Sequence, residues 1–220
     1  MTAPIVQTSR AVTLVGGGPM GRGDLELALS HAPVLVAADS GAITALDAGY
    51  MPQAVIGDLD SLDAEALARL PAERVHRITE QDSTDFDKAL RNISAPVVVG
   101  IGFTGGRLDH QLAALNTLVR LSSRPCVLLG DKDLVFHAPR SLQLDLFSGE
   151  RVSLFPMHAI SGRSTGLKWP INGLALAPDG LIGTSNQATG AMTLELDSDG
   201  MLVMLPRTNL AEVMRAITLP

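Results

Sequence analysis

Residues 54–61 read Ala-Val-Ile-Gly-Asp-Leu-Asp-Ser, an apolar run that ends in glycine and two carboxylates. An apolar run with little polar alternation predicts a strand covered on both faces, as in a parallel sheet between helices. Ligands of open α/β sheets bind beyond the carboxyl ends of the strands, which is where Asp58 and Asp60 fall. The stretch therefore predicts an α/β fold with a polar site at one edge of its sheet.

Runs of the same kind recur through the first two thirds of the chain. Buried strands are predicted at Ala11–Gly16, Val34–Ala38, Ala54–Gly57, Val97–Ile101 and Cys126–Leu129, with a short strand at Arg74–Ile78. Helices are predicted between them at Asp24–His31, Ile43–Ala48, Ala64–Arg69, Asp85–Asn92 and Asp109–Leu121. We expect Asp63 to cap the third helix and either Ser83 or Thr84 to cap the fourth. This alternation predicts a Rossmann-like parallel sheet with flanking helices and right-handed crossovers.

The pattern changes near residue 140. From Ser141 onward, short strands are separated by turn signals that are rich in glycine and aspartate, as at residues 147–149, 178–180 and 197–200. This half predicts an antiparallel β unit, either a small sandwich or a barrel, with a short helix at Asn209–Ile217. We therefore expect an α/β domain over residues 1–140 and a β domain over residues 141–220.

Composition narrows the class of protein. The 220 residues are 46% hydrophobic and 18% charged, which indicates a globular chain with a substantial core. The formal charge of −6 offers no electrostatic surface for nucleic acid or an anionic membrane, and it is compatible with metal-bound phosphates. The single cysteine, Cys126, forms no internal disulfide and fits a reducing cytoplasm. Neither a secretory signal in Met1–Arg10 nor a membrane-spanning apolar run is expected.

Asp58 and Asp60 are candidates for a metal site. Residues two apart in extended chain point to the same side, so both carboxylates face one crevice. Adjacent carboxylates repel unless a cation or a shared proton compensates, and Mg²⁺ commonly uses one or two carboxylates together with substrate phosphates. The alternative interpretation is a polar loop that caps the following helix.

A second acidic junction lies at residues 81–88, which read Gln-Asp-Ser-Thr-Asp-Phe-Asp-Lys. It follows the short predicted strand and opens a helix on the same side of the sheet, so Asp85 and Asp82 are expected near the first pair. Capping of the helix start explains such residues nearly as well, and for Asp82 in particular. Lys88 lies on the same helix face as Asp85, either as a phosphate contact or as a surface pair.

Glycine-rich turns end three other strands, at residues 16–18, 38–42 and 102–107. Glycine allows backbone N–H groups to approach phosphate closely, and Arg107 has the planar fork that clamps phosphate oxygens. Neither a Walker A sequence nor a complete Gly-x-Gly-x-x-Gly spacing is present, so a dinucleotide fingerprint is not supported and a mononucleotide stays open. Tight packing turns are the alternative, and His110 is more often a structural helix residue than a catalyst.

Trp169 is the only tryptophan, and it precedes Pro170 in the β half. A lone tryptophan is usually a core residue or an anchor. In a loop before proline, however, its flat face can stack on an organic cation.

Taken in order, these pieces resemble the thiamine pyrophosphokinase (thiamine diphosphokinase) family. The resemblance rests on the segments 38–42 (Ala-Asp-Ser-Gly-Ala), 56–61, 82–90, 105–110 (Gly-Gly-Arg-Leu-Asp-His), 166–169 (Gly-Leu-Lys-Trp) and 185–186 (Ser-Asn). The ordered set, which spans residues 38 to 186, is specific, although no single piece is decisive. The family usually has glycine where this chain has Ser40, which puts the detailed role of Asp39 in doubt.

The resemblance implies an ATP-binding catalytic α/β domain, a thiamine-binding β-sandwich and a homodimer with active sites between subunits. It implies Mg²⁺-dependent transfer of a diphosphate group from ATP to the thiamine hydroxyl, with release of AMP. The catalytic, metal and phosphate residues implied are Asp58, Asp60 and Asp85, with Asp109 on the acceptor side. The nucleotide contacts implied are Asp39, Gly41, Lys88 and Arg107, and the thiamine contacts are Gln81, Trp169, Ser185 and Asn186. Either Asp85 or Asp109 is expected to accept the hydroxyl proton.

Two other functions remain open at this level. One is a diphosphokinase that acts on another small alcohol. The other is a non-catalytic nucleotide or thiamine sensor, against which the retained acids argue mildly.

Overall fold

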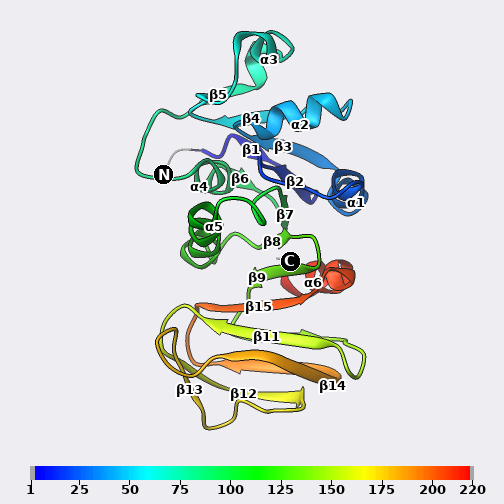
Figure 1. Cartoon of the computed structure of the whole chain (residues 1–220), viewed down its shortest axis with the longest axis vertical. Coiled ribbons are helices and arrows are strands. Elements are labelled where there is room, and N and C mark those ends of the chain that lie inside the picture. The colour runs from blue at the N-terminus through cyan, green and yellow to red at the C-terminus, as the bar shows by residue number, and fades with distance from the viewer. Residues whose placement is uncertain (1–2, 219–220) are drawn as a thin grey trace.

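Parallel strands form the α/β part of the chain, as predicted (Figure 1). The computed structural model describes residues 3–218, so the outermost ends of the two predicted domains, residues 1–2 and 219–220, lie outside the described residues. One parallel set has the order β2-β7-β8 and the other β3-β4-β5. The two sets meet where the N–H of Val34 donates to the carbonyl oxygen of Ala11 at 3.3 Å. The strands are β2 (Val12–Val15), β3 (Val34–Ala38), β4 (Ala54–Gly57), β5 (Val75–Arg77), β7 (Val98–Ile101) and β8 (Cys126–Leu129).

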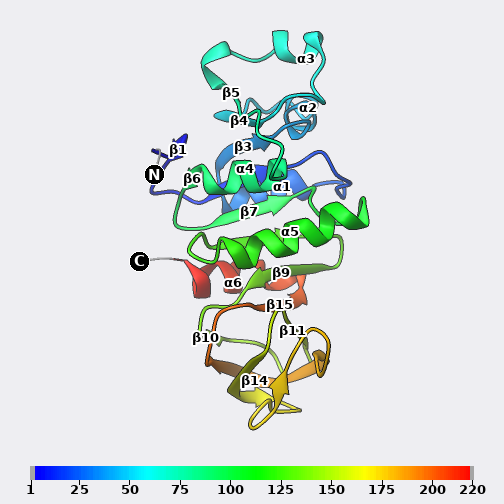
Figure 2. The ribbon, with the colours of Figure 1, turned by 90° about the vertical axis from the view of Figure 1, so that its left-hand side faces the viewer.

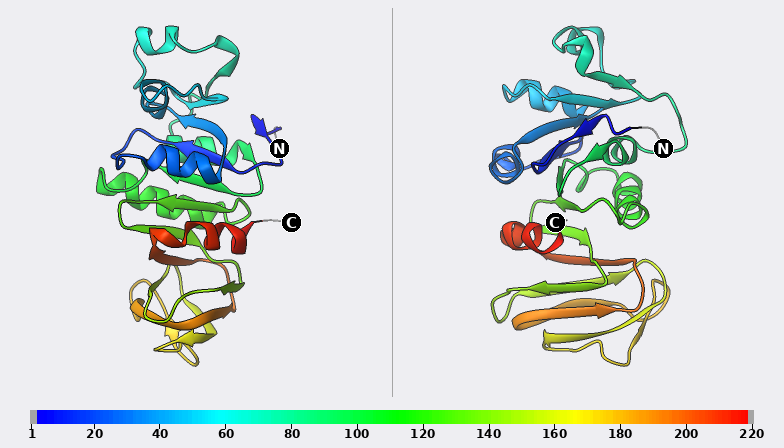
Figure 3. Two further views of the ribbon diagram at one scale, coloured as in Figure 1. Left: turned by 90° about the vertical axis from the view of Figure 1, so that its right-hand side faces the viewer. Right: turned by 180° about the vertical axis from the view of Figure 1, so that it is seen from behind.

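Helices cover both faces of these strands. Figure 2 shows α4 (Asp85–Arg91) and α5 (Leu108–Arg120) on one face. On the opposite face, seen in Figure 3, lie α1 (Asp24–His31), α2 (Gly41–Asp47) and α6 (Leu210–Ile217), while α3 (Ala64–Ala68) lies beyond β5. Because neighbouring strand residues point to opposite faces, Val55 joins the core under α1, α2 and α6, whereas Ile56 packs in the core that contains Phe86. This two-sided burial is why the strand sequences are apolar throughout.

The sheet does not stop at the predicted boundary near residue 140. Strand β8 pairs antiparallel with β9 (Asp133–His137), which pairs with β15 (Met201–Pro206), and β15 pairs with β11 (Arg151–Pro156). The result is an α/β fold with one large mixed sheet, in which β15 lies between β9, the neighbour of the parallel strands, and β11. One of the two apolar cores likewise continues from the parallel strands into the antiparallel half.

Strand β14 (Gly183–Leu196) organises the antiparallel half. Its first residues pair with β11, and its later residues pair with β12 (Ile160–Leu167) on one side and β10 (Ser141–Leu144) on the other. The two-residue strand β13 (Ala175–Leu176) closes the edge beside β12. A single 14-residue strand thus contributes to two layers of the β half.

Local details refine the predictions. Asp63 caps α3, since its carboxylate accepts the N–H of Ala66 at 2.8 Å, and Thr84 rather than Ser83 caps α4. Helix α2 begins at Gly41, two residues earlier than predicted. The predicted helix near the C-terminus is present as α6, preceded by the 3₁₀ turn η2 (Arg207–Asn209); a second such turn, η1 (Ala72–Arg74), precedes β5. The pair β1 (Val6–Gln7) and β6 (Ile93–Ser94) was not predicted, because two residues are too few to leave a pattern. Within residues 3–218, no helix combines the length and the apolar character needed to cross a membrane.

The shared sheet predicts a single cooperative unfolding transition. Leu205, fully buried in β15, pairs with Leu134 of β9. Leu205→Ala should lower the free energy of unfolding by about 3 kcal/mol, since it leaves a cavity between the two halves. Far-UV circular dichroism and the fluorescence of Trp169, which reports on the β half, should shift together in denaturant.

The matched control is Leu181→Ala, because this leucine is 51% exposed. It should leave the midpoint almost unchanged. Two separated transitions in the Leu205 variant would contradict the view that the halves form one folding unit.

Candidate active site

Three carboxylates meet at the carboxyl ends of β3 and β4 and the start of α4. Asp39 follows β3, Asp58 follows β4 and Asp85 opens α4. One oxygen atom of each lies within 4.8 Å of the other two. We call these three residues the carboxylate cluster.

Glycine at position 57 allows the close approach. A Cβ atom there would lie 3.0 Å from the Cβ of Asp39 and 3.1 Å from Oδ1 of Asp85. Any larger residue would push these two acids apart. The glycine that ends the decisive strand is therefore part of the geometry of the site.

Lys88 supplies the cation of the cluster. Its Nζ donates to Oδ2 of Asp58 at 2.8 Å and to Oδ1 of Asp85 at 3.2 Å, and its side chain is only 1% exposed. Such a buried ammonium is stable only while paired, because the desolvation of a charge is costly. Lys88 does pair with Asp85, as one interpretation of the sequence predicted, but the lysine is buried and not on the surface.

The pKa values follow this arrangement. The hydrogen bond from Lys88 lowers the pKa of Asp58. Burial raises the pKa of Asp85, and Lys88 only partly offsets that rise. Burial alone would lower the pKa of Lys88, but its hydrogen bonds to the two carboxylates outweigh it and raise that pKa. The site therefore holds an ammonium ion, an ionised Asp58 and a carboxyl group of Asp85 that takes up a proton more readily than usual.

Asp39 is the member of the cluster that has a buried carboxylate oxygen without a hydrogen-bond partner within residues 3–218. It is 5% exposed, and its backbone has the left-handed φ of 45°. Among the described residues, its Oδ1 is the one buried side-chain oxygen or nitrogen without a hydrogen-bond partner. An unsatisfied buried carboxylate oxygen beside two further carboxylates fits a hard divalent cation, since such ions take oxygen ligands.

A cleft of about 470 Å³ opens beside the cluster. It is lined by glycine-rich turns and by Asp39, Ser40, Asp85, Arg107 and His110; the turns comprise Gly16, Gly17, Gly18, Gly102 and Gly106. The turns approach closely, with the N–H of Gly18 donating to the carbonyl oxygen of Gly102 at 2.9 Å, and a Cβ on Gly18 would lie 2.5 Å from that oxygen. Tight glycine turns around a polar cleft suit a phosphate-bearing ligand.

The side chain of Ser40 lies against the first turn. A Cβ atom on Gly17 would come 2.0 Å from its Oγ. The next residue, Gly41, is buried in α2, and a Cβ atom there would lie 2.1 Å from the carbonyl oxygen of Val15. Packing of α2 against β2 therefore already requires glycine at position 41.

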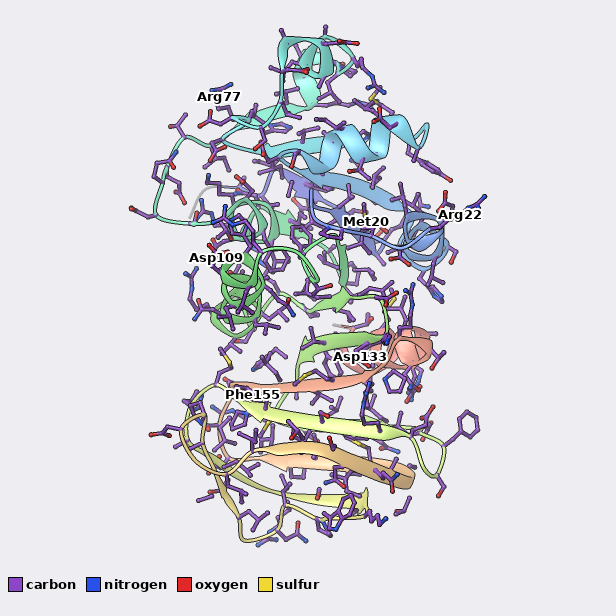
Figure 4. The ribbon with its side chains drawn as sticks, viewed as in Figure 1. Met20, Arg22, Arg77, Asp109, Asp133 and Phe155 are labelled. Atoms are coloured by element: carbon purple, nitrogen blue, oxygen red, sulfur yellow. The ribbon has the colours of Figure 1, made fainter. Side chains whose placement is uncertain are left out.

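Other predicted site residues lie outside the cluster. Asp60 is 73% exposed and faces Arg77 at 4.0 Å, at the end of β5 (Figure 4). Gln81 and Asp82 are exposed in the loop between β5 and α4. The structure thus gathers Asp39 rather than Asp60 with Asp58 and Asp85.

Asp109 forms a separate ion pair at the start of α5, labelled in Figure 4. Its carboxylate accepts two hydrogen bonds from Arg107, at 2.6 and 3.1 Å. This pairing lowers the pKa of Asp109 to about 2. Asp109 is consequently a poor proton acceptor while Arg107 remains its partner.

A second group lies in the β half. The ring of Trp169 is 54% exposed, with Nζ of Lys168 at 4.7 Å from its centre. Asn186, which is buried, holds the backbone of Trp169 through bonds of 3.1 Å from its N–H and 2.7 Å to its carbonyl oxygen. Ser185 has a left-handed φ of 60°, and its N–H donates to Ser153 at 3.0 Å. Strands β12 and β14, which carry this group, lie at the opposite end of the molecule from β3 and β4 (Figure 1).

Two features of the site were not predicted from the sequence: the place of Asp39 in the carboxylate cluster and the burial of Lys88. One signal was available for Asp39, because it follows a buried strand in the same way as Asp58 does. The burial of Lys88 depends on the packing of α4 against β4, for which a lysine in a helix gives no sign.

Comparison with known families fits this geometry. The model described as "Thiamin pyrophosphokinase, catalytic domain" matches residues 25–129, and "Thiamin pyrophosphokinase, vitamin B1 binding domain" matches residues 135–201. The chain belongs to the thiamin pyrophosphokinase family.

Individual relatives agree with this family. Thiamine pyrophosphokinase 1 of Oryza sativa subsp. japonica is 31% identical over 173 residues, which cover 70% of this chain and 65% of the rice protein. This chain thus spans less than two thirds of that relative's length. Thiamine pyrophosphokinase of Bacillus subtilis (strain 168) is 27% identical, over 91% of this chain and 100% of its own length.

Solved structures share the fold of this family member. Thiamin pyrophosphokinase from Geobacillus thermodenitrificans superposes with a TM-score of 0.73 at 27% identity, over 89% of this chain and 96% of its own. The Candida albicans enzyme has a TM-score of 0.75 at 14% identity, over 94% and 95%, and so supports the fold alone.

Removal of the buried ammonium should destabilise the protein. Lys88→Met leaves Asp58 and Asp85 without their shared cation, so the free energy of unfolding should fall by about 3 kcal/mol at neutral pH. Chemical denaturation in the presence of a chelator measures this loss.

Arg69→Met is the matched control, because Arg69 pairs with Asp47 at 2.9 Å on the surface, where ion pairs contribute little. Equal losses in the two variants would contradict the importance of burial at Lys88.

Proposed function

We propose that this family member is a thiamine diphosphokinase, which transfers a diphosphate group from ATP to the thiamine hydroxyl and releases AMP. The observation that carries the proposal is the carboxylate cluster around Lys88 beside a glycine-lined cleft. The match to both a catalytic and a vitamin B1 binding domain model, and the names of the relatives, support the choice of thiamine. A sensor or a diphosphokinase for another alcohol is less favoured, because neither alternative has a specific observation behind it.

We assign the α/β part, residues 1–140, to ATP binding and catalysis, and residues 141–220 to thiamine binding in a β-sandwich. The participation of β14 in two layers supports the sandwich. Because β9 pairs with β15, the sheet continues across this boundary, so the division that we propose is one of function and not of the sheet.

Asp39, Asp58 and Asp85 are the proposed holders of Mg²⁺, with Asp60 as a further candidate from the family resemblance. The ion would neutralise phosphate charge during transfer. Lys88 holds Asp58 and Asp85 in place and adds a positive charge next to the transferring group. The glycine turns, Asp39, Gly41 and Arg107 are the proposed nucleotide contacts, and Ser40 shapes the turn at which the family usually has glycine.

The attacking hydroxyl needs a proton acceptor. A base works best when its pKa approaches the working pH. Burial raises the pKa of Asp85, whereas Arg107 holds the pKa of Asp109 at about 2. Without a metal, Asp85 is therefore the better acceptor of the two, whereas Mg²⁺ bound to Asp85 would lower its pKa again. Asp109 with Gln81 is assigned to orientation of thiamine.

The proposed active site is completed by a second copy of the chain. Of the thiamine contacts proposed in the β half, Ser185 and Asn186 belong to β14, and Trp169 follows β12. Both strands lie at the far end of the molecule from β3 and β4 (Figure 1). A homodimer in which each α/β part faces the partner's β half would bring the two groups together. Trp169 is exposed and its ring already attracts the ammonium of Lys168, so the thiazolium cation of thiamine would stack on this ring by taking the place of Lys168. The buried lone Cys126 supports the cytoplasm as the place of action.

The product assay tests the reaction. Purified protein with thiamine, ATP and Mg²⁺ should form AMP and thiamine diphosphate in equal amounts, resolved by ion-exchange chromatography. Asp58→Asn should lower kcat roughly 100- to 1,000-fold while the circular dichroism spectrum is unchanged, as when one electrostatic group is lost. Formation of ADP and thiamine monophosphate would rule out diphosphate transfer.

Subunit mixing tests the shared site. Asp58→Asn and Trp169→Ala should each be nearly inactive alone, because each damages a different half of every site. After the two are unfolded and refolded together, about a quarter of the wild-type activity should return, since half of the dimers are mixed and hold one intact site. No recovery in verified mixed dimers would place each site within one chain.

A further inference from the structure

A chain of ion pairs runs along α4 and ends on the loop that carries Gln81. Arg120 of α5 donates to Asp87 of α4, and Asp87 also accepts a bond of 3.3 Å from Arg91 one turn later. The other terminal nitrogen of Arg91 donates to Oε1 of Glu80 at 2.6 Å. The chain therefore joins two helices to the loop at residues 79–84.

This network is separate from the catalytic cleft. Neither Glu80 nor Asp87 nor Arg91 lines the cleft. On α4, Asp87 pairs with Arg91, whereas Asp85 pairs with Lys88. The carboxylate of Asp87 is only 3% exposed, and two guanidinium groups balance its charge. Burial of a carboxylate in a position that touches no ligand calls for a structural purpose.

Asp87 fixes the guanidinium group of Arg91 independently of Glu80. An exposed ion pair usually contributes little, because two long side chains lose their freedom to form it. Here the guanidinium group of Arg91 is already fixed by Asp87, so pairing with Glu80 restricts it little further. The pair is thus a firmer anchor than its half-exposed position suggests.

Glu80 and Ser83, which lie on either side of Gln81 and Asp82, are joined by a hydrogen bond. The Oγ atom of Ser83 donates to the same oxygen of Glu80 that Arg91 holds. Gln81 itself has only a bond of 3.5 Å to the carbonyl oxygen of Thr79. Within the described residues, Thr84 ties the end of this loop to α4 as its cap, and before Gln81 the side-chain tie to the helix is the pair of Glu80 with Arg91.

We propose that Arg91 is a positioning residue, which through Glu80 and Ser83 holds the loop at residues 79–84 so that Gln81 is presented to the alcohol substrate. The inference rests on the proposed function, in which Gln81 contacts thiamine. Arg91 touches neither nucleotide nor metal ligands in this account, so its effect is confined to the acceptor.

Hydrogen exchange tests the anchor without any turnover. In ligand-free protein, peptides that cover residues 79–84 should exchange several-fold faster in Arg91→Met than in wild type, and Arg91→Lys should restore most of the protection. Arg120 still pairs with Asp87 in these variants, so the helices should stay folded. Arg69→Met, which breaks a surface pair elsewhere, should leave these peptides unchanged. Unchanged exchange in Arg91→Met would overturn the proposal.

Steady-state kinetics test the consequence. Arg91→Met and Glu80→Gln should each raise KM for thiamine about tenfold, as expected when a substrate-positioning loop is loosened, and leave kcat and KM for ATP within about twofold. The double variant should be no worse than either single one, because both remove the same contact. Equal losses toward ATP and thiamine, or additive effects, would overturn the positioning role. Wild-type protein without thiamine diphosphokinase activity would refute the proposed function together with this inference, whereas normal wild-type and variant kinetics would refute the inference alone.

Discussion

The site depends on one buried ammonium ion. Lys88 lies between Asp58 and Asp85, and without it like charges would face each other at the end of a tightly packed sheet. The lysine can be there only because α4 packs directly on β4, with Gly57 leaving room for Asp39 and Asp85. Charge balance and sheet packing are thus one constraint: the position of the helix fixes the distances between the acids, and the acids make the buried lysine tolerable.

Burial of the strands on both faces explains why the parallel half could be predicted well from the sequence. A strand buried on both faces must be apolar at every position, so residues 34–38, 54–57 and 126–129 could be delimited from composition alone. The acids at strand ends were equally visible, because ligands of such sheets gather there. What local pattern could not supply was distance. Asp60 and Asp58 look equivalent in sequence, but the left-handed turn at Leu59 leaves Asp60 in solvent beside Arg77.

The sequence predicted least where two segments in contact lie far apart in the chain. The pairing of β9 with β15 joins residues 133–137 to 201–206, and nothing within either segment announces the other. The same is true of the ties from Arg207 to Asp24 and from Asn186 to Trp169. Family resemblance filled part of this gap for the ligand, because an ordered set of motifs carries information about contacts that single motifs do not.

The position of β15 between β9 and β11 affects how the sheet can form during translation. Because β15 follows β9 only after strands β10 to β14, the large sheet stays open at β9 until residues 201–206 have been synthesised. During translation, the α/β part can pack its strands against its helices before β15 exists. Until then, the backbone groups of β9 that pair with β15 have no strand partner. A nascent chain halted before residue 201 is therefore exposed to wrong strand partners, and β15 is the strand that removes this hazard.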